Sequence, residues 1–93
     1  MTKREFLQQL KPKTLIKIEV KGCEGFSQVR FVEFRDDNLY YITLENEQEL
    51  KQEHEDWFDD SVEDMWEYWW TGIPIEHVRK VGLADEMLRV LYE

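Results

Sequence analysis

The fold is decided by the stretch QVRFVEFRDDNLYYITL at residues 28–44. Two segments rich in β-branched and aromatic residues, 28–35 and 39–44, flank the Asp-Asp-Asn sequence at 36–38. Such residues favour strands, and Asp and Asn side chains favour tight turns, so the stretch predicts an antiparallel hairpin.

The alternation of side chains breaks in the first strand of this hairpin. Val29 and Phe31 fall on one face, whereas Val32 and Phe34 fall on the other. Either a β-bulge or a strand that is buried on both faces would explain the break.

The chain before the hairpin predicts a helix followed by a strand. Thr2 and Glu5 form a capping-box pattern at the start of a short helix over residues 3–10. From Thr14 the apolar period changes to two, which predicts a half-buried strand that closes at Gly22.

After Leu44 the apolar period returns to 3.6 and predicts two helices. Asn46 and Glu49 can cap the first, which ends near Asp59-Asp60. Ser61 begins the second, and its apolar stripe contains Val62, Met65, Trp66, Trp69 and Trp70. Gly72 supplies a left-handed stop and Pro74 prevents the helix from resuming.

The remaining chain predicts one further strand and a helix. Residues 73–81 are compatible with a strand or with a helix that begins at Pro74, and the alternation of Ile73 and Ile75 favours the strand. Residues 83–92 have a helical apolar face.

This order of elements predicts one α+β domain over residues 1–93, with helices packed on one face of a three- to four-stranded antiparallel sheet. The alternative is a small SH3- or Sm-type barrel with an acidic helical insertion. One cysteine, Cys23, excludes an intramolecular disulfide, and no segment approaches the ~20 apolar residues that span a bilayer. We therefore expect a cytoplasmic protein that does not associate with membranes.

The net charge of −9 is concentrated in one segment. Residues 45–67 contain eleven carboxylates and one cation, Lys51, interleaved with large aromatic side chains. These carboxylates could imitate the phosphates of a nucleic acid, or they could be a solvated helical face. Like charges one helical turn apart repel each other, so a mixed-charge surface would give solubility at lower cost, which favours a binding role.

The candidate partner-binding residues are the exposed acids of the two helices and the aromatic residues near the end of the second. They are Glu49, Glu53, Asp56, Asp59, Asp60, Glu63, Asp64, Glu67, Tyr68 and Trp70. Trp and Tyr dominate the energetics of protein interfaces, and Tyr68 falls off the apolar stripe.

No catalytic or metal-binding signature accompanies these residues. Residues 56–67 have the length of a calcium loop, but Phe58 and Ser61 stand where that loop needs an oxygen ligand and a glycine. His54 and His77 match no ligand spacing, and Cys23 has no flanking base. We expect no cofactor, no metal and no enzymatic activity.

The first 21 residues are basic, with Lys3, Arg4, Lys11, Lys13, Lys17 and Lys21. They could form a nucleic-acid footprint, with Lys17 and Lys21 on one strand face. The nearby negative charge favours the other reading, in which they complement the acidic helices within the fold or between two copies.

The order of these elements resembles that of some small phage-encoded anti-CRISPR proteins. The similarity covers the helix 3–10, the strand 14–20, the hairpin around 36–38 and the acidic stretch from Glu45. Those proteins bind an RNA-guided nuclease, and type II inhibitors use acidic side chains to occupy the basic surface that reads the protospacer-adjacent motif. The resemblance implies that role for Glu53, Asp56, Asp59, Asp60, Glu63 and Asp64.

The sequence therefore predicts an acidic, non-enzymatic interaction protein that binds the basic surface of a nucleic-acid-binding protein and does not bind nucleic acid directly. An alternative from another class is a structural or assembly subunit that binds through a surface rich in Trp and Tyr.

Overall fold

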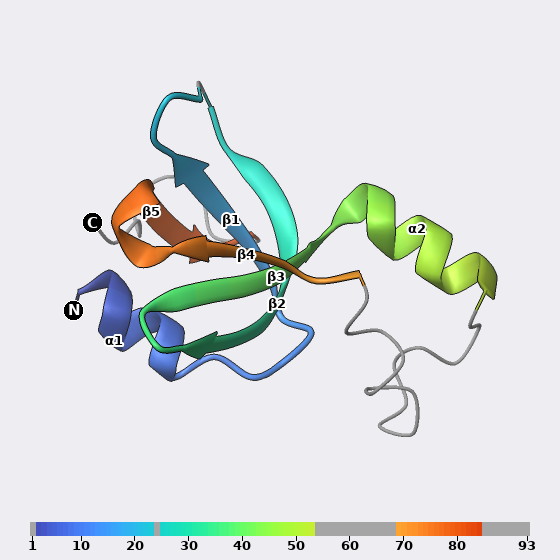
Figure 1. The fold of residues 1–93 in the computed structure, drawn as a ribbon, viewed down its shortest axis with the longest axis horizontal. Coiled ribbons are helices and arrows are strands. Elements are labelled where there is room, and N and C mark those ends of the chain that lie inside the picture. The colour runs from blue at the N-terminus through green and yellow to red at the C-terminus, as the bar shows by residue number, and fades with distance from the viewer. Residues whose placement is uncertain (1, 24, 54–68, 85–93) are drawn as a thin grey trace.

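The computed structural model describes residues 2–23, 25–53 and 69–84 (Figure 1). The helical elements are α1 (Lys3–Gln8), α2 (Leu44–Glu53) and the 3₁₀ turn η3 (Ile75–His77). The strands are β1 (Leu15–Val20), β2 (Ser27–Arg35), β3 (Asn38–Thr43), β4 (Thr71–Pro74) and β5 (Val78–Leu83). None of the helices in these ranges is long and apolar enough to cross a bilayer.

The five strands form one antiparallel sheet in the order β4-β3-β2-β1-β5. This confirms the α+β class, but the predicted number of strands was too low. Residues 73–81 form the end of β4, the turn η3 and most of β5, because Pro74 ends one edge strand and η3 then leads the chain to the opposite edge of the sheet. The sheet is open, because β4 and β5 lie at its two edges and no pairing joins them, so the described strands do not close into a complete SH3- or Sm-type barrel. The three-residue turn η3 nevertheless connects these two edge strands directly.

The hairpin between β2 and β3 turns through two residues, Asp36 and Asp37. Both have positive φ angles, 54° and 61°, as a type I′ turn requires. Asn38 pairs with Arg35 as the first residue of β3, so the turn is one residue shorter than predicted. The right-handed twist of the strands favours this turn, and Asp tolerates the left-handed conformation.

Of the two explanations that the sequence left open, the β-bulge is present in β2. The register with β3 shifts between Phe31 and Glu33, which leaves Val32 as the extra residue. Because of this extra residue, Phe34 returns to the face of Val29 and Phe31 and packs against their apolar cluster, whereas Val32 lies in another. The prediction that Val32 and Phe34 share a face is therefore wrong.

The larger cluster, the main core, lies between α1 and the sheet. Thr2 caps α1 by accepting a hydrogen bond from the Glu5 backbone N–H at 3.2 Å, as the capping box predicts. The helix then contributes Phe6 and Leu7. The other buried members are Ile16, Ile18, Val29, Phe31, Leu39, Tyr41, Ile75, Val78 and Val81.

The smaller cluster, the α2 core, joins Leu50 of α2 to Val32 and Ile42. Successive side chains of a strand point to opposite faces, so Ile42 and its neighbour Tyr41 serve different clusters. The two helices therefore belong to separate clusters, which differs from the predicted packing on one face. In Figure 1, α2 extends from one end of the sheet and α1 lies below the other end.

Gly72 does not end a helix. It lies within β4, which begins at Thr71, and it pairs with Tyr40 of β3. The predicted helices over 61–72 and 83–92 lie outside the described residues except at their ends, where Thr71 and Leu83 belong to strands.

Candidate interaction surface

The helix α2 is capped by Thr43, whose Oγ1 accepts a hydrogen bond from the Asn46 backbone N–H at 3.2 Å. The predicted cap at Asn46 is therefore wrong. The Asn46 side chain instead donates to the backbone carbonyl of Trp69 at 3.3 Å, which ties α2 to the chain that precedes β4. Glu45 and Glu47 lie in the first turn, where the positive end of the helix dipole favours carboxylates.

Three exposed carboxylates form a row along α2. Glu45, Glu49 and Glu53 follow one another at intervals of four residues, which is a rise of about 6 Å per step. None of the three forms an ion pair within the described ranges, and their mutual repulsion costs a few tenths of a kcal/mol per pair. We call these three residues the carboxylate row.

Glu47 is excluded from this row by its position. It is only 5% exposed, and its Oε1 lies 2.9 Å from Arg30 Nε and 3.6 Å from Lys51 Nζ. The one cation of the acidic segment is thus directed to the buried carboxylate, so it does not neutralise the row.

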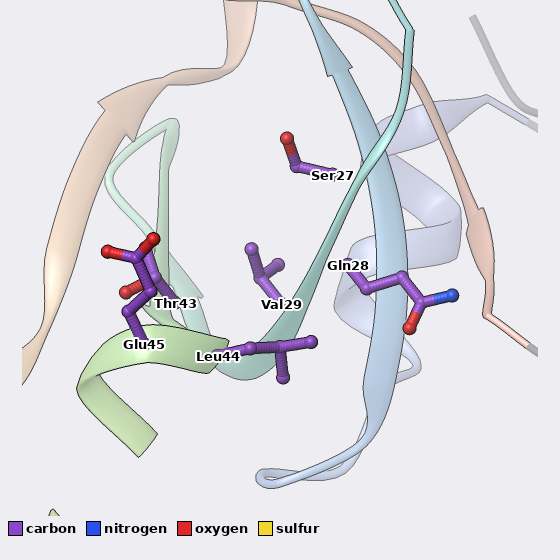
Figure 2. A pocket seen from close by; sticks show the side chains of 6 residues that line it. All are labelled: Ser27, Gln28, Val29, Thr43, Leu44 and Glu45. Carbon is purple, nitrogen blue, oxygen red and sulfur yellow. The ribbon is translucent and has the colours of Figure 1, made fainter. Parts of the chain in front are cut away.

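A shallow groove of about 420 Å³ adjoins the start of α2 (Figure 2). Its lining comes from the first residues of β2 and from the junction of β3 with α2, namely Ser27, Gln28, Val29, Thr43, Leu44 and Glu45. Figure 2 shows Val29 between Thr43 and Glu45 on one side and Gln28 on the other, with Ser27 above it. Among the described residues of this lining, Glu45 is the one ionisable side chain.

An aromatic side chain of β3 lies close to one that directly precedes β4. The ring centroids of Tyr40 and Trp70 are 6.1 Å apart at 49°, and Arg35 Cζ lies 5.4 Å from the Tyr40 centroid. A side-chain hydrogen bond with Tyr40 and the charge of Glu33 raise the pKa of Arg35 above its ordinary value. Arg35 is also ion-paired with Glu33 at 3.3 Å.

The structure places three of the ten predicted partner-binding residues. Glu49 and Glu53 are exposed on α2, and Trp70 is half-buried against the α2 core. The structure therefore brings two of the predicted residues, Glu49 and Glu53, together in the carboxylate row. The other seven lie outside the described residues: Asp56, Asp59, Asp60, Glu63, Asp64, Glu67 and Tyr68.

Sequence reasoning did not assign roles to Glu45 and Arg30. For Glu45, the signal in the sequence was its position four residues before Glu49, which places both side chains on one helix face. For Arg30, the signal was a cation between two apolar strand residues, Val29 and Phe31, which requires a partner when that part of the strand is covered.

The basic N-terminal residues do not form one exposed footprint. Lys17 is 8% exposed, so it cannot share an accessible strand face with the exposed Lys21. Within residues 2–23, 25–53 and 69–84, no three His, Cys, Asp or Glu side chains are grouped so that they could hold a metal ion.

Comparisons with models of known protein families, with curated proteins and with solved structures each found no match to this chain.

Proposed function

We propose that the chain is an acidic, non-enzymatic interaction protein that occupies the basic surface of a nucleic-acid-binding protein. The carboxylate row of α2 is the observation that supports this proposal most directly. The row keeps three like charges on one exposed helix face. The only cation of the helix, Lys51, lies beside the buried Glu47 instead.

The charge of the whole chain supports the same proposal. The row continues in sequence into seven more carboxylates between residues 54 and 67, and the net charge is −9. A negative potential of this kind repels phosphates and steers basic protein surfaces toward the chain. On this proposal the protein acts in the cytoplasm and needs no cofactor.

The resemblance to anti-CRISPR inhibitors gives the proposal its most specific form. In that form the partner is an RNA-guided nuclease, and the carboxylates compete with the nucleic acid for the basic surface that binds it. The resemblance rests on the order of the elements and on the acidic segment that starts at Glu45.

A pull-down from host lysate at low and high salt tests the proposal. We expect a nucleic-acid-binding protein to be recovered at low salt and lost at high salt, because steering between exposed charges is screened beyond ~10 Å at 0.1 M salt. Recovery of no such protein at either salt concentration would refute the proposal.

A matched pair of double variants separates the row from the net charge. Glu49→Gln with Glu53→Gln, and Asp36→Asn with Glu76→Gln, each remove two exposed carboxylates and change the net charge from −9 to −7. We expect a several-fold lower association rate with the recovered protein for the first variant alone. Equal effects of the two variants would show that only the net charge matters.

The cluster of Arg35, Tyr40 and Trp70 favours a second candidate, an assembly subunit that binds through aromatic surface. These are the three residue types most enriched at interface hot spots. Binding or self-association that is insensitive to salt, and that is weakened by Trp70→Ala in a variant with an unchanged far-UV spectrum, would favour this candidate over the first.

A further inference from the structure

The helix α2 is attached to the sheet through two fully or nearly buried side chains of its own. Leu50 is 0% exposed and contacts the apolar side chains of Val32 and Ile42. Glu47, three residues earlier on the same helix face, is the other. A buried carboxylate is costly unless it is paired, so its partner determines where the helix can lie.

Arg30 is that partner, and it binds in two directions. Its Nε donates to Glu47 Oε1 at 2.9 Å, and its Nη1 donates to the backbone carbonyl of Lys13 at 3.2 Å. Lys13 is itself fixed, because its N–H donates to the Phe31 carbonyl at 2.7 Å. Arg30 therefore connects α2 to the interior of the sheet and to the loop that precedes β1.

We infer that the ion pair between Arg30 and Glu47 is a latch that fixes the rotation of α2 about its own axis. Consecutive residues of an α-helix are about 100° apart, so Glu45 and Glu49, each two positions from Glu47, lie about 160° from it on either side. Holding Glu47 against the sheet therefore holds these two members of the carboxylate row toward solvent.

Leu50 alone would not define this rotation as sharply. Apolar contact has little directional preference, whereas a hydrogen-bonded ion pair requires a particular geometry. Arg30 presents its donors in a rigid planar group, and Lys51, whose Nζ is 3.6 Å from the same carboxylate, reinforces the position of Glu47 from within the helix. The consequence of the latch for binding rests on the proposed function, whereas the latch itself is a property of the isolated protein.

Amide hydrogen exchange measured by NMR on the isolated protein tests the latch. In Glu47→Gln we expect the amides of Gln48 to Glu53 to exchange about tenfold faster or more, with β1, β2 and β3 within twofold of the wild type. Glu49→Gln removes an exposed carboxylate of the same helix that forms no ion pair within the described ranges, so it is the matched control and should not accelerate exchange in α2. Unchanged exchange in α2 of Glu47→Gln, or equal acceleration of all amides, would overturn the inference.

Arg30→Lys provides a test that does not remove a charge. It keeps the cation but loses the planar donor group, so we expect a smaller acceleration that is again confined to α2. Exchange in α2 identical to that of the wild type would show that charge alone holds the helix and would overturn the latch.

Binding to a polyarginine peptide separates this inference from the proposed function. Faster exchange in α2 of Glu47→Gln, with polyarginine binding unaffected in both Glu47→Gln and the Glu49, Glu53 double variant, would support the latch and refute the role of the row. Weaker polyarginine binding by the double variant, together with normal exchange in α2 of Glu47→Gln, would support the role of the row and refute the latch.

Discussion

The ring of Tyr40 lies over Gly72 on the adjacent strand. The two residues are paired across β3 and β4, and a Cβ added to Gly72 would lie 2.7 Å from Tyr40 Cε1. Any larger residue at this position would need the Tyr40 ring to move, because the ring occupies the space that a side chain would take.

Gly72→Ala should therefore lower the free energy of unfolding. We expect a loss of about 1 to 3 kcal/mol, as for other overpacked sites, measured by urea denaturation. In a Tyr40→Leu background the same substitution should cost less, because the ring that it meets is gone. An equal cost in both backgrounds would mean that the effect comes from the backbone of Gly72 and not from the ring.

Leu50→Ala should destabilise the attachment of α2. Leu50 is 0% exposed, and truncation of such a side chain costs about 2 to 5 kcal/mol. Thermal or urea unfolding measures the loss. Gln48→Ala, at an exposed position of the same helix, is the control and should stay within about 0.5 kcal/mol of the wild type.

Substitutions of Asp36 should move stability in opposite directions. Its φ of 54° is easily adopted by glycine and strongly disfavoured for a β-branched residue. We expect Asp36→Gly to raise the free energy of unfolding by a few tenths of a kcal/mol and Asp36→Val to lower it by about 1 to 2 kcal/mol. If both variants were equally stable, the turn would not have the type I′ geometry.

Tyr41 should make stability fall at alkaline pH. Burial, and then the charge of Cys23, raise the pKa of Tyr41 above its ordinary value of 10.0. Above pH 10 the unfolded chain loses the phenolic proton first, so the stability contributed by neutral Tyr41 is present below pH 10 and is lost as pH rises through the higher folded pKa.

Unfolding in urea between pH 8 and pH 11 measures this effect. Tyr41→Phe should show a smaller decline over that range than the wild type, and ultraviolet titration of the wild type should show one tyrosine ionising late. Identical declines for both proteins would assign the alkaline loss to other groups.

Local chemistry explains what could be predicted from the sequence. The hairpin was predictable because the turn residues and the strand residues are adjacent, and the bulge because it disturbs alternation within one strand. The capping box of α1 is likewise a contact between residues three apart.

The features that were not predicted depend on residues far apart in the chain. The role of Gly72 requires knowing that Tyr40 faces it, and the burial of Glu47 requires Arg30, which is 17 residues away. Composition groups Glu47 with Glu49 in one acidic segment. Their spacing of two residues places them on different faces of a helix, and only the fold shows that the face of Glu47 meets Arg30. Residues 73–81 combine two strand segments and a 3₁₀ turn, so neither a strand period nor a helix period describes them.

The loop between β1 and β2 leads to a practical consequence. Cys23 is the only cysteine of the chain, and it is exposed in this loop, which in Figure 1 lies at the top of the molecule while α2 lies at the right. A maleimide dye would therefore attach at one defined position without any engineered thiol. Fluorescence anisotropy of the labelled protein could then follow complex formation while every carboxylate of α2 stays chemically intact.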